Sequence, residues 1–131
     1  MSVIVVDSCV VAKWILPETD SDKAHRLASV AAKRGDRLVV LDLAFPEVAN
    51  VIWKRYRQKA LRLDEVHDCL ADLLRSPGQV EPAIPLLGSA VEIAAKHDRS
   101  IYDALFVALC NALSADGITA DAPPMHRFAE R

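Results

Sequence analysis

Four carboxylates in this sequence stand at positions where an α/β protein can hold a metal ion. Asp7 directly follows a short apolar run, Glu47 lies a few residues after a second one, and Asp121 directly follows a third. Asp103 stands near the start of an apolar segment with helical spacing. Carboxylates that gather repel one another unless a cation compensates their charge, and Mg²⁺ and Mn²⁺ prefer hard oxygen ligands. A bound ion of this kind activates water, so the acids imply hydrolysis of a phosphodiester.

Each acid also has an ordinary structural explanation. Asp103 stands three residues after Ser100, and this Ser-x-x-Asp spacing is close to a helix capping box. Glu47 follows a proline, as acids do in the first turn of a helix, and Asp121 precedes two prolines and suits a turn. Asp7 is hardest to explain in this way, because a charge at the end of a fully apolar strand is partly desolvated. The metal site therefore depends on the convergence of all four acids, which sequence spacing does not prove.

The elements that position these acids alternate between strands and helices. Apolar runs predict buried strands at 3–6 and 38–41, a weak strand at 80–83 and a short strand at 117–120. Periodicity and capping residues predict helices at about 10–16, 21–34, from Pro46 into a basic stretch, at 64–74, at 85–96 and from Ser100 onward. Pro123 and Pro124 argue against any strand beyond Asp121.

This alternation predicts an α/β fold with three layers, α/β/α, around a central and largely parallel sheet. Open sheets of this class bind ligands outside the carboxyl ends of their strands, so we expect all four acids at one edge of the sheet. The length of 131 residues fits one domain, residues 1–131.

Composition limits the classes of protein to consider. A net charge of -2 argues against a protein that binds nucleic acid through a generally basic surface. A nuclease that binds its own divalent metal can still be acidic overall. Three widely spaced cysteines favour reduced thiols over a disulfide framework, and Cys9 and Cys110 are expected to be buried small hydrophobic residues. With no signal-peptide pattern and no apolar run of membrane-spanning length, we expect a cytoplasmic protein without a membrane association.

Other polar and aromatic residues allow more than one interpretation. The basic residues of 54–62 either solvate a helix end or steer phosphate toward the acids. Lys13 is expected to be exposed, with phosphate contact as the alternative. Trp14 and Trp53 are expected to pack in the core or in a dimer interface rather than stack on bases. The four histidines lack metal-ligand spacing, so a zinc mechanism has little support.

Four segments in order resemble the PIN-domain family and, within it, VapC-like toxins of type II toxin–antitoxin systems. The segments cover 5–18 (VVDSCVVAKWILPE), 46–54 (PEVANVIWK), 101–109 (IYDALFVAL) and 118–121 (ITAD), so the resemblance extends over essentially the whole chain. The sequence departs from the family pattern after Asp121, where Ala122-Pro123-Pro124 replaces residues that favour a helix.

The resemblance implies a PIN-like fold and a specific set of site residues. Asp7, Glu47, Asp103 and Asp121 would form a site for Mg²⁺ or Mn²⁺, with the hydroxyls of Ser8 and Thr119 nearby. It also implies endoribonuclease activity on RNA, a homodimer, and inhibition by an antitoxin protein whose peptide enters a groove near the acids.

Two other functions remain open from the residues alone. A phosphoaspartyl protein would also place an aspartate after its first strand, but Asp7-Ser8-Cys9 lacks the second aspartate of a haloacid-dehalogenase motif. A non-catalytic RNA- or protein-binding module could keep the same fold, although an RNA binder gains nothing from clustered negative charge.

Overall fold

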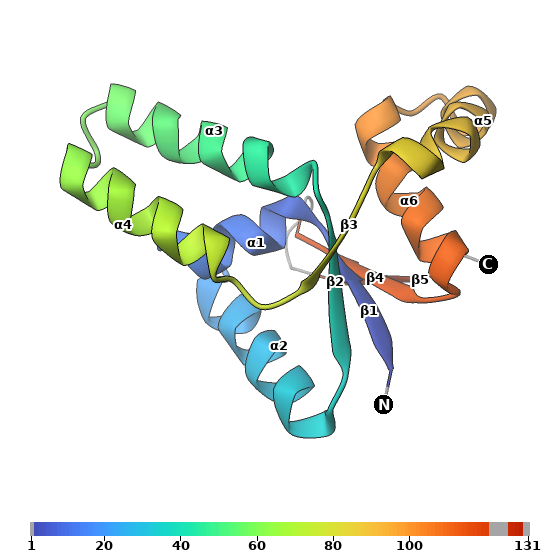
Figure 1. The fold of residues 1–131 in the computed structure, drawn as a ribbon, viewed down its shortest axis with the longest axis horizontal. Helices are drawn as coiled ribbons and strands as arrows, with labels where there is room; N and C mark the ends of the chain where they lie inside the picture. Colours follow the sequence, from blue (N-terminus) through green and yellow to red (C-terminus); the bar gives the residue numbers. More distant parts are fainter. Residues whose placement is uncertain (1, 121–125, 130–131) are drawn as a thin grey trace.

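A five-stranded sheet forms the centre of the molecule (Figure 1). The computed structural model describes residues 2–120 and 126–129. The strands are β1 (Val3–Val6), β2 (Arg37–Leu41), β3 (Gln79–Glu81), β4 (Asp116–Thr119) and β5 (His126–Ala129), in the order β3-β2-β1-β4-β5. The first four strands are parallel to one another, and β5 pairs antiparallel with β4.

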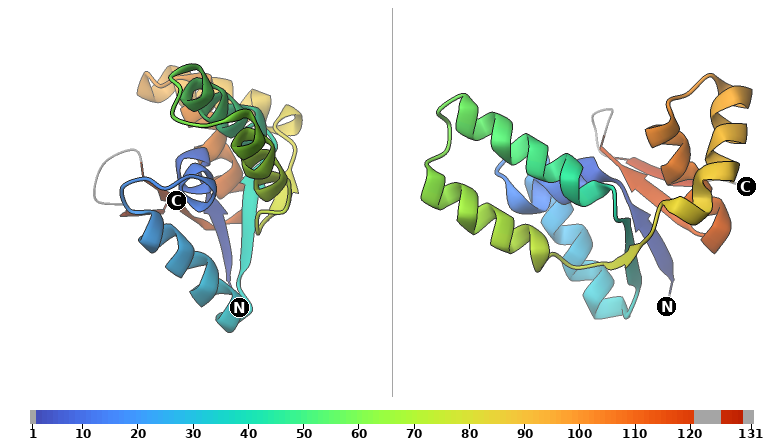
Figure 2. Two further views of the ribbon diagram at one scale, coloured as in Figure 1. Left: turned by 90° about the vertical axis from the view of Figure 1, so that its left-hand side faces the viewer. Right: turned by 45° about the horizontal axis from the view of Figure 1, so that its top comes forward.

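Helices cover both faces of this sheet. One face carries α1 (Ser8–Ile15), α2 (Ser21–Arg34), α3 (Ala44–Arg57) and α4 (Leu63–Leu74). The other carries the short 3₁₀ helix η1 (Ile84–Leu86), α5 (Leu87–His97) and α6 (Ile101–Leu113). Figure 2 shows that α3 and α4 lie side by side as a hairpin that extends away from the sheet. The expected three-layer α/β/α arrangement with a largely parallel sheet is therefore confirmed.

Side-chain alternation in the strands produces one hydrophobic core on each face. Ile4 and Val6 of β1 belong to the core beneath α1 to α4, whereas Val5 belongs to the core beneath α5 and α6. In β2, Val40 and Val39 divide between the two cores in the same way. Strands buried on both faces read as continuous apolar runs, which explains why β1 and β2 could be predicted from the sequence.

Close packing between β4 and α6 requires a glycine. A Cβ atom at Gly117 would lie 2.6 Å from Phe106 Cζ and 2.7 Å from Cys110 Sγ. The missing side chain therefore lets α6 rest directly on β4, and this contact determines where the start of α6 lies relative to the sheet.

Two local expectations differ from the structure. The first helix begins at Ser8 rather than Val10, because the Asp7 side chain caps it. The expectation that no strand follows Pro123 and Pro124 is wrong, since β5 begins at His126 and pairs with β4 through its backbone. A proline removes a hydrogen-bond donor only at its own position, so a strand can begin after it. In the described part of the chain, every helix is too short or too polar to span a bilayer.

Candidate active site

Asp7 lies at the carboxyl end of β1 and caps the helix that follows. Its extended backbone (φ -76°, ψ 157°) lets Oδ1 accept a hydrogen bond of 2.7 Å from the Ser8 backbone N–H. The negative charge is also favoured by the positive end of the α1 dipole. Asp7 is half-buried, so this carboxylate is held by the fold rather than being loosely solvated.

Side chains from two distant parts of the chain surround the Asp7 carboxylate. The Thr119 hydroxyl donates to Oδ2 at 3.0 Å, and the Ser8 hydroxyl lies 3.5 Å from Oδ1. Both hydroxyls flagged in the sequence therefore lie beside Asp7. The Cys9 thiol also donates to Oδ2, at 3.4 Å. Sequence reasoning missed this contact because Cys9 stands in an apolar run; its position in the first turn after a capping aspartate was the available signal.

Glu47 and Asp103 both lie in the first turns of helices. Glu47 belongs to α3, which follows β2, and Asp103 belongs to α6, which leads into β4. A helix that follows a parallel strand, or that leads back into one, starts at the carboxyl edge of the sheet, and Figure 1 shows α3 and α6 starting there. Both acids, in the first turns of these helices, are therefore on the same side of the sheet as Asp7. The Asp103 backbone N–H donates to Ser100 Oγ at 3.1 Å, as expected for a capped helix start.

The described carboxylates share an edge but do not form a closed cluster. Within residues 2–120, no three His, Cys, Asp or Glu side chains stand close enough to hold a metal ion. Asp121 lies outside the described residues, and the side chains of Glu47 and Asp103 are exposed. Mg²⁺ is usually bound through one or two carboxylates and several waters, so this donor set still suits a hard divalent cation.

Two of the cations on α1 and α3, Lys13 and Arg55, are engaged in structural contacts. Lys13 Nζ donates to the Thr19 carbonyl at 2.6 Å and lies 3.6 Å from Glu18, and Arg55 pairs with Glu18 at 2.7 Å. The expectation that Lys13 is exposed is wrong, because only 13% of its side chain is exposed. Lys54 and Arg57 remain exposed, with no ion pair to another described residue.

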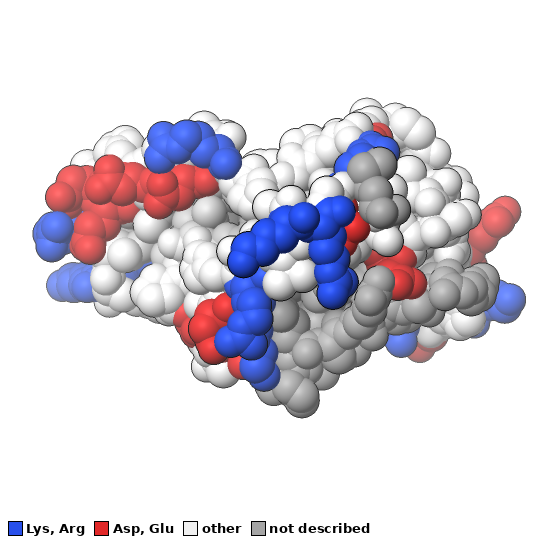
Figure 3. All heavy atoms as spheres, turned by 90° about the horizontal axis from the view of Figure 1, so that it is seen from below, with Lys and Arg blue, Asp and Glu red and all other residues white. Residues whose placement is uncertain are grey.

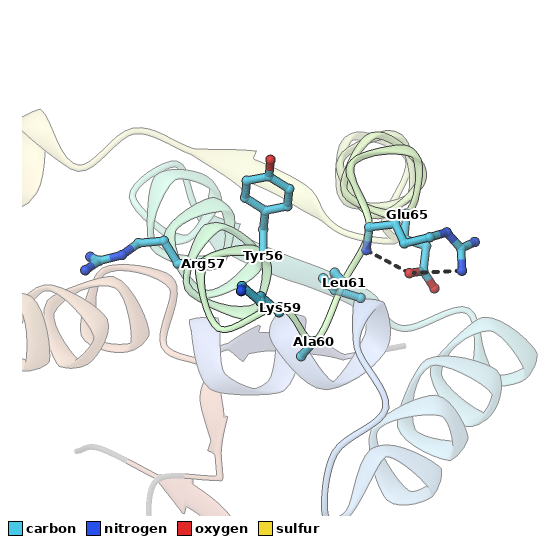
Figure 4. A pocket seen from close by; sticks show the side chains of 7 residues that line it. Tyr56, Arg57, Lys59, Ala60, Leu61 and Glu65 are labelled. Carbon is cyan, nitrogen blue, oxygen red and sulfur yellow. Dashed lines mark hydrogen bonds and ion pairs between the residues drawn. The ribbon is translucent and has the colours of Figure 1, made fainter.

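A shallow hollow of about 700 Å³ lies at the outer end of the α3–α4 hairpin (Figure 4). Its lining includes Tyr56, Arg57, Lys59 and Arg62. Arg62 is turned toward Asp64, and this hydrogen bond lowers the pKa of the Asp64 carboxyl. Ten residues of helix separate Arg57 from Glu47, a length of about 15 Å, so the hollow is distinct from the carboxylate edge.

The two tryptophans have different environments. Trp14 Nε1 donates to the Ala24 carbonyl at 2.7 Å and packs against the core, as expected. Trp53 is 49% exposed and lies beside Tyr56, with ring centroids 5.9 Å apart and ring planes tilted by 31°. Of the two environments expected for Trp53, packing in the core is therefore wrong, and packing in a dimer interface stays a prediction.

Comparison with known proteins agrees with this fold. The family model of the PIN domain matches residues 4–130, and the chain belongs to the PIN domain family. Within that family it is VapC-like: it is 35% identical over 127 residues to Ribonuclease VapC3 of Pyrobaculum aerophilum, covering 95% of this chain and 94% of the relative.

Two solved structures share the fold at 20% sequence identity. The crystal structure of PAE2754 from Pyrobaculum aerophilum matches with a TM-score of 0.64 over 92% of this chain and 75% of that chain. The crystal structure of VapC20 of Mycobacterium tuberculosis, described as a sarcin–ricin loop cleaving toxin, matches with a TM-score of 0.65 over 86% and 84%.

Proposed function

We propose that this protein is an endoribonuclease that hydrolyses RNA phosphodiester bonds with Mg²⁺ or Mn²⁺. The observation that carries the proposal is the half-buried Asp7 carboxylate, held at the carboxyl edge of the sheet by Ser8, Cys9 and Thr119. The 35% identity to a protein named as a VapC ribonuclease supports the same reaction.

In this mechanism, the chain's own residues would bind the metal ion and orient it toward the RNA. Asp7, Glu47, Asp103 and Asp121 would hold the metal, directly or through water. When bound, the metal supplies an activated water and compensates the charge on the scissile phosphate. The contacts to Asp7 fix the direction of its carboxylate, because the Ser8 N–H, the Cys9 thiol and the Thr119 hydroxyl all donate to it. Glu47 and Asp103, on exposed first turns, would complete the site as metal and RNA arrive.

The direct test replaces single acids by amides of the same size. Asp7→Asn and Asp103→Asn should each abolish Mg²⁺-dependent RNA cleavage while thermal unfolding shows an intact fold. Asp98→Asn is the matched control, since Asp98 is an exposed acid at the end of α5 with a positive φ of 52°, which Asn tolerates. If purified Asp103→Asn cuts RNA at the wild-type rate, the site assignment is wrong.

Titration of the wild-type protein with Mn²⁺ separates this proposal from its alternative. A non-catalytic RNA- or protein-binding module on the same fold would show no metal binding by calorimetry. This alternative is worth testing because the described acids do not form a closed cluster.

We further propose that the protein is the toxin of a type II toxin–antitoxin system and acts in the cytoplasm as a single PIN domain. Its partners would be RNA, a cognate antitoxin and a second copy of the chain. We expect RNA to bind away from α4, where Asp64, Asp68 and Asp72 follow one another at one-turn intervals and only Asp64 and Asp72 have an ion pair among the described residues, with Arg62 and Arg75. Figure 3 shows acidic side chains gathered at the α4 end of the molecule and Lys and Arg side chains over its middle.

The toxin proposal is tested by expression in cells. The wild-type gene should arrest growth when expressed alone and be tolerated together with the neighbouring antitoxin gene. The Asp103→Asn gene should be harmless in both settings. Harmless expression of the wild-type chain alone would contradict the toxin role but not the nuclease activity.

A further inference from the structure

The Cys9 thiol occupies a junction between two strands that lead to the candidate site. Sγ donates to Asp7 Oδ2 at 3.4 Å and accepts the Ala120 backbone N–H at 3.1 Å. It also lies 3.5 Å from the Thr119 hydroxyl. Cys9, in the first turn of α1, thereby contacts the carboxylate of Asp7 nearby in the sequence and the backbone of Ala120, which is 111 residues away.

The reason for this junction lies in how the parallel ladder ends. β1 and β4 pair with Val6 opposite Ile118, and the Asp7 N–H donates to the Ile118 carbonyl at 3.0 Å. The next bond of a parallel ladder would run from the Ala120 N–H to the Asp7 carbonyl. That carbonyl already accepts from Val10 and Val11 at the start of α1. The thiol takes the Ala120 N–H instead and extends the link between β1 and β4 by one more bond.

We infer that Cys9 is a positioning residue for the metal site, an inference that rests on the proposed function. Cys9, Asp7, Thr119 and Ala120 together form what we call the thiol clamp. In the clamp, the Cys9 thiol donates to Asp7 Oδ2 and also accepts the backbone N–H of Ala120. Ala120 directly precedes Asp121 in the sequence. Groups that orient metal-binding carboxylates typically change metal affinity by 10- to 100-fold when they are removed.

The alternative is that Cys9 only fills space, since it is half-buried and packs against the core. The two roles differ in what a hydroxyl would do. Serine keeps a donor and an acceptor at this point, whereas alanine removes both. A positioning role therefore predicts that serine restores what alanine loses, while a space-filling role predicts that both substitutions act alike.

The experiment measures Mn²⁺ affinity by calorimetry for wild type, Cys9→Ala and Cys9→Ser. We expect Cys9→Ala to bind Mn²⁺ at least about tenfold more weakly and Cys9→Ser to stay within about threefold of wild type. Cys69→Ala is the matched control: Cys69 is a half-buried thiol on α4 that packs against the same core as Cys9 but lies on no element that carries a proposed ligand, so its loss should leave Mn²⁺ affinity unchanged. Equal affinities of wild type and Cys9→Ala, or equal losses in both Cys9 variants, would overturn the inference.

A second measurement does not depend on metal. Hydrogen exchange followed by NMR should show faster exchange of the Ala120 amide in Cys9→Ala than in wild type or Cys9→Ser. Unchanged protection of that amide would also overturn the clamp. If wild-type protein binds no Mn²⁺, the proposed function and the positioning role both fail, and accelerated exchange at Ala120 would then leave Cys9 with a structural role only.

Discussion

The Asp7 carboxylate has a structural role as well as the catalytic role proposed for it. It caps α1 through the Ser8 N–H, and its other oxygen accepts from Thr119 on the neighbouring strand. The sequence indicated the importance of Asp7 because a charge ending an apolar strand needs partners. It did not reveal how those partners act, because the contact with Thr119 joins residues 112 positions apart and depends on strand register.

Thr119→Val tests the side-chain hydrogen bond that β4 donates to Asp7. Valine has nearly the same shape and suits a strand, but it removes the hydroxyl that donates to Oδ2. We expect Mg²⁺-dependent RNA cleavage to fall about tenfold. The free energy of unfolding, measured by urea denaturation, should fall by only about 1 kcal/mol.

The control for this substitution is Thr19→Val, which removes a hydroxyl from an exposed position between α1 and α2. It should change neither cleavage nor stability appreciably. A Thr119→Val protein with the wild-type cleavage rate would show that the Asp7 carboxylate needs no support from β4.

Cys69 on α4 provides a prediction about pH. Burial raises the pKa of its thiol, and the nearby carboxylates of Asp72, Glu65 and Asp68 add to the effect. Alkylation by iodoacetamide requires the thiolate, so the Cys69 rate should keep rising beyond pH 8.5, where an ordinary thiol is half ionised. Mass spectrometry resolves the three cysteines, because they fall in separate tryptic peptides.

Unfolding supplies the control for this measurement. In denaturant, the alkylation rate of Cys69 should rise with pH around the ordinary thiol pKa and level off above it. Because the unfolded thiol loses its proton first, this group favours unfolding as pH rises above that ordinary value. A native Cys69 that titrates like a denatured one would contradict the prediction.

At the scale of elements, local signals predicted most of the fold. The β-branched run before Asp7 became β1, and α2 ends at Gly35, whose φ of 72° lies in the left-handed region that glycine adopts easily. The sequence did not predict β5, because this strand is defined by its backbone pairing with β4 and not by a local apolar run. The early start of α1 was missed because it depends on the side chain of Asp7 acting as a cap.

The start of α6 is the element most directly tied to the site. Ser100 caps it by accepting from the Asp103 N–H, so Ser100→Ala removes an N-cap. We expect the free energy of unfolding to fall by about 1 kcal/mol in urea denaturation. Because the first turn would fray, the cleavage rate should also decrease, and the decrease should grow with temperature.

Ser29→Ala is the comparison for this loss. Ser29 is exposed within α2, where alanine favours the helix, so stability should stay within about 0.5 kcal/mol of wild type. Equal effects of the two substitutions would mean that the Ser100 hydroxyl contributes nothing to the start of α6.

At the scale of the whole molecule, topology accounts for the part of the site that the sequence could predict. Parallel strands with helical crossovers bring the acids after β1, after β2 and before β4 to one edge, whatever the details of packing. The distances between those acids do not follow from topology. They depend on contacts such as Gly117 against Phe106, which no local pattern reveals.

The proposed homodimer also belongs to this scale. Ile84, Leu87 and Val91 follow one another at helical spacing on η1 and α5 and are 78%, 43% and 56% exposed. The segment 82–91 contains no charged residue. An uncharged apolar strip suits a self-complementary interface, because interface cores are depleted of charge and a two-fold contact would bring like charges together. We therefore expect a second copy of the chain to cover this strip.

Ile84→Glu tests that interface. Placing a carboxylate in the strip of both copies should convert the dimer into a monomer, so light scattering after size-exclusion chromatography should give a mass near 14.4 kDa instead of twice that value. Leu74→Glu is the matched control, because Leu74 is 70% exposed on the opposite layer, and it should leave the dimer intact. If the two variants have the same mass as wild type, the strip is not where the copies meet, and if only Leu74→Glu dissociates, the interface lies on the α3–α4 hairpin.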